Sequence, residues 1–213
     1  MQRMNFIIVL FVAWTAAAYS AELRPVDEAA KNPSFREFRS QLLRAVEQKD
    51  RGHLFGVLAP DIRNSFGGND GKDAFAEQWK LDSTDSEVWK ELKWILTHGG
   101  SFFEDGSFCA PYVYSRWPDN YDAFEYAAVV SDRLPVRKSR SAASAVVGRL
   151  RYTIVKVLDE QWSRAKPGEL IKVQANSIVG FVPAGTLRSS PDWRACFAKQ
   201  EKGWLMTMLV AGD

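Results

Sequence analysis

The pattern of hydrophobic and polar positions changes twice along this chain, and each change marks a new kind of element. Residues 6–18 form an uncharged, mostly apolar run. Between residues 34 and 105, apolar side chains recur at three- and four-residue spacing, which is typical of helices packed on one face. From Ala127 onward, short runs rich in valine and isoleucine alternate with turn residues, which indicates β-strands. The pattern therefore predicts a leader, a helix-rich half and a strand-rich half.

Residues 1–20 have the composition of a secretory signal peptide. Arg3 supplies a positive start, the apolar run follows, and small residues surround Ser20. The run is too short to span a membrane, and charged Glu22 follows soon after it. We therefore expect cleavage after Ser20 and a periplasmic or secreted mature chain without a membrane anchor.

The helix-rich half begins after a linker over residues 21–33. Ser34, with Glu37 three residues later, predicts a capping box at the start of a helix that runs to about Asp50. Asp70 is expected to cap a later helix that ends near Trp79. The other elements predicted in this half are a helix over 53–58, a brief strand over 61–66 and a helix over 84–98.

The strand-rich half ends in a predicted hairpin, with residues 200–203 as its loop. We expect an α+β fold, in which a helix-rich N-terminal domain precedes a small all-β, SH3-like barrel with an appended C-terminal hairpin. The predicted divisions are a signal peptide (1–20), a linker (21–33), a helix-rich domain (34–105), an aromatic and proline-rich connector (106–126) and a barrel domain (127–213).

Charge divides the chain at the same place. Residues 21–126 carry a net charge of −6 and residues 127–213 a net charge of +7, which supports two domains. The whole chain has a net charge of +2, so a dedicated nucleic-acid binder, which would be strongly basic, is not expected.

Residues 129–187 resemble the bacterial SH3 (SH3b) domain of exported envelope proteins. The turns differ from those of the family, because Pro135, Arg140 and Thr153 stand where it usually has Asn, Pro and Gly. The resemblance implies a targeting or binding module for envelope polymers or partner proteins. The matching elements, in chain order, are Leu134-Pro135-Val136-Arg137, Val146-Val147-Gly148 with Leu150, the valine-rich strand over 153–157, Trp162, and Val179-Gly180-Phe181-Val182 with Leu187.

Arg137, Arg149 and Arg151 are candidate binding residues in this basic half. Guanidinium groups bind carboxylates through paired hydrogen bonds, and peptidoglycan stem peptides and acidic envelope proteins both carry carboxylates. We therefore expect peptidoglycan or an envelope protein as the partner. Two alternatives stay open: Arg137 anchors a turn, or the arginine-rich face docks onto the chain's own acidic half.

Nine aromatic residues lie between Phe102 and Tyr126, and prolines interrupt the run. Tyr112, Tyr114 and Trp117 are candidate binding residues within it. Aromatic side chains dominate buried interfaces, so sealing the contact between the two domains is the favoured role. The alternative is a platform on which sugar rings or peptide side chains stack.

Cys109 and Cys196 are the two cysteines of the chain. An even count in an exported protein favours a disulfide between them, and two buried free thiols remain the alternative. Such a bond would close a loop of 87 residues. In the chain-entropy model, a loop of this length stabilises the fold by about 4–5 kcal/mol.

Catalytic chemistry finds little support in the composition. His53 and His98 both precede Cys109, and they lack the helical spacing of a zinc peptidase. We therefore expect no catalytic residue, no metal and no cofactor, and a non-enzymatic binding or structural module of the cell envelope. The alternative is a carboxylate-dependent cell-wall glycosidase in the N-terminal half, for which the candidates are Glu104, Asp105, Asp119, Asp122 and Glu125.

Overall fold

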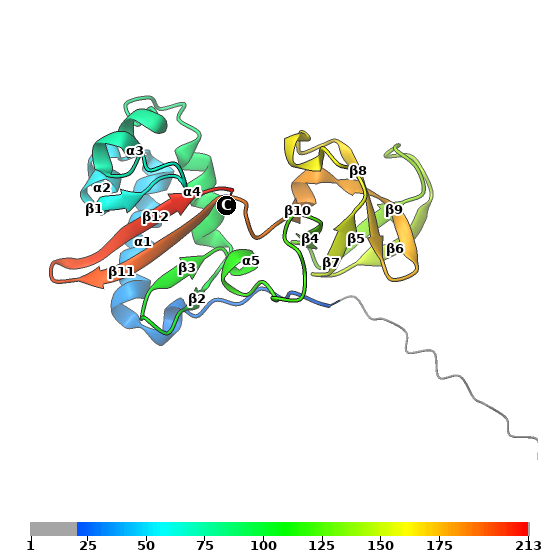
Figure 1. Cartoon of the computed structure of the whole chain (residues 1–213), viewed down its shortest axis with the longest axis horizontal. Coiled ribbons are helices and arrows are strands. Elements are labelled where there is room, and N and C mark those ends of the chain that lie inside the picture. Colours follow the sequence, from blue (N-terminus) through cyan, green and yellow to red (C-terminus); the bar gives the residue numbers. More distant parts are fainter. Residues whose placement is uncertain (1–20, 213) are drawn as a thin grey trace, which may run out of the picture.

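The computed structural model describes residues 21–212, so the predicted signal peptide lies outside the described residues. Within this range the chain forms two domains side by side (Figure 1). The first, which we call the split domain, comprises residues 21–125 and 189–212. The second, the inserted domain, comprises residues 126–188. In the sequence it is inserted between the two segments that form the split domain.

The split domain packs helices against one face of a mixed five-stranded sheet (Figure 1). Its strands follow the order β1-β12-β11-β3-β2, and β1 runs parallel to β12 while the other pairs are antiparallel. The helices are α1 (Pro33–Gln48), α2 (Arg51–Gly56), α3 (Lys72–Gln78), α4 (Val88–Thr97) and α5 (Tyr112–Ser115), with a 3-10 turn at Ala29–Lys31. The strands are β1 (Leu58–Arg63), β2 (Ser101–Phe102), β3 (Phe108–Ala110), β11 (Arg194–Gln200) and β12 (Gly203–Val210).

The inserted domain is a seven-stranded antiparallel sheet with the order β10-β4-β7-β8-β9-β5-β6. Along β8 the side chains alternate between buried and exposed, because one face of the sheet covers the domain core. Two 3-10 turns, Trp162–Arg164 and Ala184–Thr186, lie in its loops. The strands are β4 (Tyr126–Val129), β5 (Leu134–Arg137), β6 (Val146–Leu150), β7 (Ile154–Val157), β8 (Leu170–Ala175), β9 (Ile178–Pro183) and β10 (Leu187–Arg188).

The predicted fold class is wrong. The described residues form twelve strands in two sheets, so the molecule is mostly β rather than a helix-rich domain followed by a small barrel. The C-terminal hairpin does not extend the second domain: β12 pairs with β1, and β11 pairs with β3. Sequence adjacency suggested the wrong partner. The strands β11 and β12 bury their apolar face against α1 and α4, which lie about a hundred residues or more earlier in the chain.

Local capping also differs from the prediction at two helices. Asn32, not Ser34, caps α1: its side chain accepts a hydrogen bond from the Phe35 N–H at 3.1 Å, and Pro33 takes the first helical position. Asp70 does not cap α3, because its carboxylate instead accepts from the backbone N–H of Asn64 at 2.8 Å. The brief strand expected over 61–66 is β1, and it begins earlier, at Leu58.

Each domain has its own hydrophobic core. In the split domain, Phe35 of α1 is fully buried, and its ring lies 4.3 Å from that of Phe108 and 4.9 Å from that of Trp204. The core of the inserted domain is a separate cluster of mainly aliphatic side chains, among them Val136, Val155 and Val182. Two self-contained cores are what define these as two domains.

The segment over residues 21–28, expected to be an unstructured linker, joins both domains as an extended arm. The Leu23 N–H donates to the Tyr152 carbonyl of the inserted domain at 2.6 Å. Further along the arm, the Val26 carbonyl accepts from the Gly100 N–H of the split domain at 2.9 Å. Leu23 also belongs to the small apolar cluster at the junction, together with Tyr112 and Ile154.

The domain boundary seen in the structure changes where the excess positive charge of the C-terminal half is assigned. Residues 127–188 hold eleven basic and four acidic side chains, a net charge of +7. The C-terminal hairpin region, residues 189–213, is neutral, with three basic and three acidic side chains. The excess positive charge of the C-terminal half therefore belongs to the inserted domain alone.

Candidate functional site

Three exposed arginines, Arg133, Arg149 and Arg151, lie on β6 or directly beside the open end of the hairpin formed by β5 and β6, and we call them the arginine face. In the described sheet β6 is an edge strand with β5 as its neighbour. Arg149 stands opposite Pro135 of β5. Arg149 lies on β6, and Arg151 directly follows Leu150, the last residue of that strand, in a bend.

The pairing of the two hairpin strands places Arg133 beside the other two arginines. Leu134 and Leu150 are register partners, and both are buried. Beyond them, the Tyr152 N–H donates to the Ser131 carbonyl at 2.8 Å, so the two chains stay adjacent. Arg133 and Arg151 therefore lie next to each other at the end of the hairpin.

The arginine face is a concentration of like charge without internal neutralisation. Among the described residues, none of its three guanidinium groups has an ion-pair partner. Like charges held close together repel each other, and an anion bound between them would relieve that repulsion. The face is exposed and does not dock onto the acidic split domain, which was the internal alternative.

Arg137 has a different environment from the other candidate arginines. Its guanidinium donates to the Ser144 carbonyl at 2.9 Å, across the loop that connects β5 to β6. Arg140 in the same loop binds both carboxylate oxygens of Asp159 at 2.8 Å. These two side chains hold the loop, which leaves Arg133, Arg149 and Arg151 as the arginines open to a ligand.

The structure separates the aromatic candidates. Tyr112 is 1% exposed in the apolar junction between the domains, and half-buried Trp117 packs against the same cluster. The Trp117 indole N–H donates to the Tyr121 carbonyl at 2.8 Å. Tyr114 is directed elsewhere: the Arg194 guanidinium lies 5.0 Å from its ring centroid. The three residues do not form one stacking platform.

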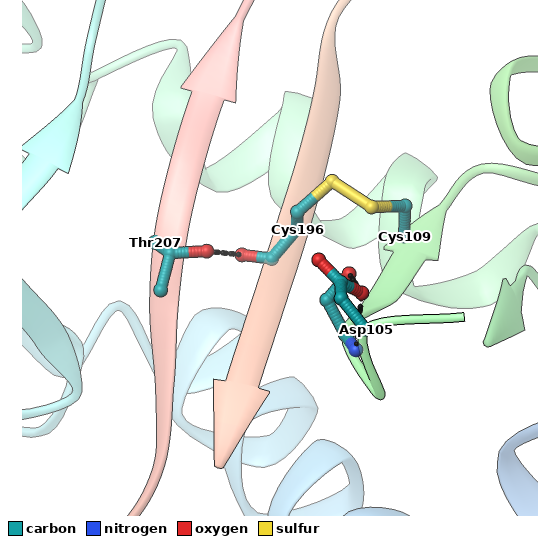
Figure 2. The surroundings of a disulfide bond; sticks show 5 residues. Asp105, Cys109, Cys196 and Thr207 are labelled. Atoms are coloured by element: carbon teal, nitrogen blue, oxygen red, sulfur yellow. Dashed lines mark hydrogen bonds between the residues drawn. A yellow bond between two sulfur atoms is a disulfide. The ribbon is translucent and has the colours of Figure 1, made fainter. Parts of the chain in front are cut away.

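Cys109 and Cys196 form a disulfide, which confirms the predicted pairing (Figure 2). The two residues are register partners on the adjacent strands β3 and β11, with their Cα atoms 4.2 Å apart. On the other side of β11, the Thr207 hydroxyl of β12 donates to the Cys196 carbonyl at 3.2 Å. The bond therefore ties the two parts of the split domain within one sheet.

A stack of three side chains at the junction escaped the sequence analysis. The Arg188 guanidinium lies 4.2 Å from the Trp94 ring centroid, and the Trp94 ring stacks on the His98 ring at 4.0 Å. Trp94 and His98 are four residues apart on one helix face, a spacing that brings side chains into contact and could have predicted this pair. Arg188, on β10, could not have been found without the fold.

The carboxylates considered for glycosidase chemistry are dispersed over exposed loops. Asp105 accepts hydrogen bonds from Ser107, which lower the pKa of its carboxyl. Asp122 accepts from the Phe124 N–H, and Glu125 forms an ion pair with Lys156 at 3.1 Å. A general acid in a glycosidase needs a raised carboxyl pKa, which is the opposite of the Asp105 shift.

Residues 21–212 contain neither a cluster of metal-binding side chains nor a helix that could span a membrane. No group of three or more His, Cys, Asp or Glu side chains within residues 21–212 is arranged to hold a metal ion. In the same part of the chain, no helix has the length and apolar character needed to cross a membrane.

Comparisons with known proteins find no matching family and a weak structural similarity. No family model matches the chain, and no curated protein matches it. A designed NTF2-like protein of solved structure aligns with 85% of this chain and 99% of its own, at 14% identity and a TM-score of 0.26. A TM-score this low carries no argument about fold or function.

Proposed function

We propose that this protein is an exported, non-enzymatic binding module of the cell envelope, and that the arginine face of its inserted domain is the binding surface. The single observation that carries the proposal is the exposed group Arg133, Arg149 and Arg151, which has no ion-pair partner among the described residues, on a domain of net charge +7. The resemblance of residues 129–187 to bacterial SH3 domains supports the same role.

The ligand that fits this surface bears several carboxylates. Guanidinium groups recognise carboxylates through two parallel hydrogen bonds, and arginines grouped on one hairpin favour a ligand with repeated acidic groups. Peptidoglycan presents the carboxylates of its stem peptides in this repeated way. We therefore propose peptidoglycan as the ligand, and an acidic envelope protein is the competing partner that the experiment has to distinguish.

The disulfide and the junction support an exported, preorganised protein. A disulfide persists in oxidising compartments, which agrees with the signal-peptide composition of residues 1–20. The arm over residues 21–28 connects the two domains, so the arginine face is presented from a fixed position relative to the split domain.

Co-sedimentation of residues 21–213 with purified sacculi tests the proposal. We expect binding that decreases as salt rises, because exposed charges are screened within about 10 Å at 0.1 M salt. Replacing Arg133, Arg149 and Arg151 together by Ser should abolish it. A charge-matched control replaces Arg36, Lys90 and Lys202, which are exposed cations of the split domain, and should bind like the parent.

Two results would count against the proposal in different ways. Sedimentation that neither salt nor the arginine replacements reduce would exclude an arginine–carboxylate mechanism. Absence of sedimentation, together with arginine-dependent capture of an acidic protein from envelope extract, would retain the surface and replace the ligand.

A further inference from the structure

A groove of about 870 Å³ lies in the split domain beside the turn of the β11–β12 hairpin, and we call it the hairpin groove. Figure 1 shows this turn at the end of the split domain that is farthest from the inserted domain. Helix α1 and the hairpin line the groove, together with the connection from α2 to β1 and the start of α3. Small-molecule sites are clefts of about 300–1,000 Å³, so the hairpin groove is large enough for such a ligand. Its lining includes Phe38, Val57, Lys72, Lys199, Lys202 and Leu205.

Apolar side chains form the interior of the hairpin groove. Phe38, Val57 and Leu205 line it, and each is only half-buried against the core of the domain, so part of its surface stays open. The indole N–H of Trp204, which also lines the groove, already donates to the Ser34 hydroxyl at 3.0 Å. Burying a polar group without a partner is unfavourable. The interior therefore suits a ligand whose body is apolar and forms no hydrogen bonds.

The charged side chains of the lining carry an excess of positive charge. Of the two carboxylates, Glu37 pairs with Arg44 at 3.8 Å, which leaves Glu201 as the one without an ion-pair partner in the described chain. This excess stands out because residues 21–126 carry a net charge of −6. Three lysines line the groove, and none has an ion-pair partner within residues 21–212: Lys72, Lys199 and Lys202.

Two of these lysines lie together at the hairpin turn. Lys199 is the register partner of Trp204, and residues directly opposite each other in an antiparallel pair share one face of the sheet. Lys199 therefore lies on the face from which the Trp204 ring packs against Phe35, 4.9 Å away. Lys202 belongs to the turn itself, so the hairpin end of the groove has two ammonium groups beside an apolar interior.

We infer that the hairpin groove binds a free fatty acid, with its alkyl chain in the apolar interior and its carboxylate beside Lys199 and Lys202. A sugar would leave hydroxyl groups unpaired against the interior, and a cationic amphiphile would be repelled by the lysines. A wholly apolar molecule would gain nothing from those lysines. The hairpin groove and the arginine face lie on different domains, so this inference does not depend on the arginine face or on its ligand.

Nuclear magnetic resonance titration of ¹⁵N-labelled residues 21–213 with dodecanoate, below the concentration at which it forms micelles, tests the inference. We expect saturable shifts of the backbone signals of Gly56, Val57 and Gly203, while the signals of Val155 and Val173 in the inserted domain stay unchanged and show that the fold is intact. Each buried methylene strengthens binding about fourfold, so octanoate should bind at least tenfold more weakly. Dodecyltrimethylammonium, which has the same chain and the opposite charge, should also bind more weakly than dodecanoate.

Three variants test the contribution of charge, and all of their substituted residues are exposed, so folding should not be affected. Replacing Lys199 and Lys202 together by Gln should weaken dodecanoate binding about fivefold, the effect of losing two exposed ion pairs of ordinary strength. Glu201→Gln, on the same turn, should strengthen it about twofold, because it removes a repelling carboxylate. Replacing Lys31 and Lys90 together by Gln removes the same charge outside the groove and should leave binding unchanged.

Four results would overturn the inference. They are the absence of saturable shifts at the groove, equal dodecanoate affinity in the parent and the Lys199 and Lys202 variant, weaker binding by Glu201→Gln, and equal or tighter binding of dodecyltrimethylammonium. Vesicles that contain anionic phosphatidylglycerol distinguish a membrane surface from a free fatty acid. Association with these vesicles, without shifts from dodecanoate, would assign the groove to a membrane contact and would also overturn the inference.

Discussion

Cys109 on β3 and Cys196 on β11 stand directly opposite each other, and the disulfide between them encloses the entire inserted domain. Because β4 and β10, at the two ends of that domain, are themselves neighbours in one sheet, folding of the inserted domain already brings the two ends of the loop together. The disulfide then closes only the segments on either side of it.

Replacing both cysteines by Ser should therefore destabilise the split domain more than the inserted one. We expect the free energy of unfolding of the split domain to fall by about 2–5 kcal/mol, the range for removing a native disulfide. Hydrogen exchange measured by mass spectrometry, with and without reductant, would resolve the two domains. An equal loss of protection in both domains would contradict this account.

Gly99 should not tolerate a side chain, because its φ of 61° is left-handed and a Cβ there would collide with the Val26 carbonyl of the arm. Gly99→Ala should lower the free energy of unfolding by about 2 kcal/mol, within the range for overpacking a tight site. Gly56→Ala, in α2, is the matched control, since a Cβ there meets nothing within 4 Å. We expect it to be neutral or slightly stabilising by denaturant titration, and similar losses in both variants would argue against a steric origin.

Acidification should weaken the fold through His98. Burial, and to a smaller extent the charge of Arg188, lowers the pKa of His98, so the unfolded chain binds this proton more readily than the folded one. The stabilisation is complete above the unfolded pKa of about 6.5 and is lost as the pH falls from there toward the lowered folded pKa. The thermal midpoint should drop more between pH 7.5 and pH 5.5 in the parent than in His98→Asn, and equal drops in the two proteins would contradict this account.

Asp192 should affect stability with the opposite pH dependence. Burial raises the pKa of its carboxyl, so the folded state favours the protonated form, and stability is lost as the pH rises through the raised pKa. Asp192→Asn retains an oxygen that can accept from the Ser189 N–H, as the Asp192 carboxylate does at 2.9 Å. Its thermal midpoint should exceed that of the parent at pH 7 and approach it near pH 3, and a lower midpoint at pH 7 would show that the charge is favourable.

The domain boundary expected from the sequence (127–213) and the boundary seen in the structure (126–188) predict different behaviour for isolated fragments. Residues 126–188 contain a complete buried cluster, so this fragment should fold alone and give dispersed nuclear magnetic resonance signals. Residues 127–213 should give the same signals plus an unstructured set, because β11 and β12 would lack the strands and helices that cover them. A folded C-terminal hairpin in the longer fragment would contradict the topology.

Local sequence was sufficient where neighbouring residues decide the structure. The helical spacing of Val88, Leu92 and Ile95 predicted α4, and the short runs rich in valine and isoleucine after Ala127 predicted strands such as β8, because one buried face imposes each pattern. The cysteine pairing also followed from the even count and the expected compartment. The leader and the envelope role of the protein remain predictions, since they rest on residues 1–20 and on a resemblance.

Only the tertiary structure decided which elements belong together. A β-strand satisfies its hydrogen bonds and buries its face equally well against a near or a distant partner, so the sequence of β11 and β12 did not reveal that they complete the sheet begun by β1 and β3. For the same reason, the sequence could not place Tyr112, Tyr152 and His98 around one cavity. Their nearness depends on an arm, a helix end and an inserted domain that meet only after the chain has folded.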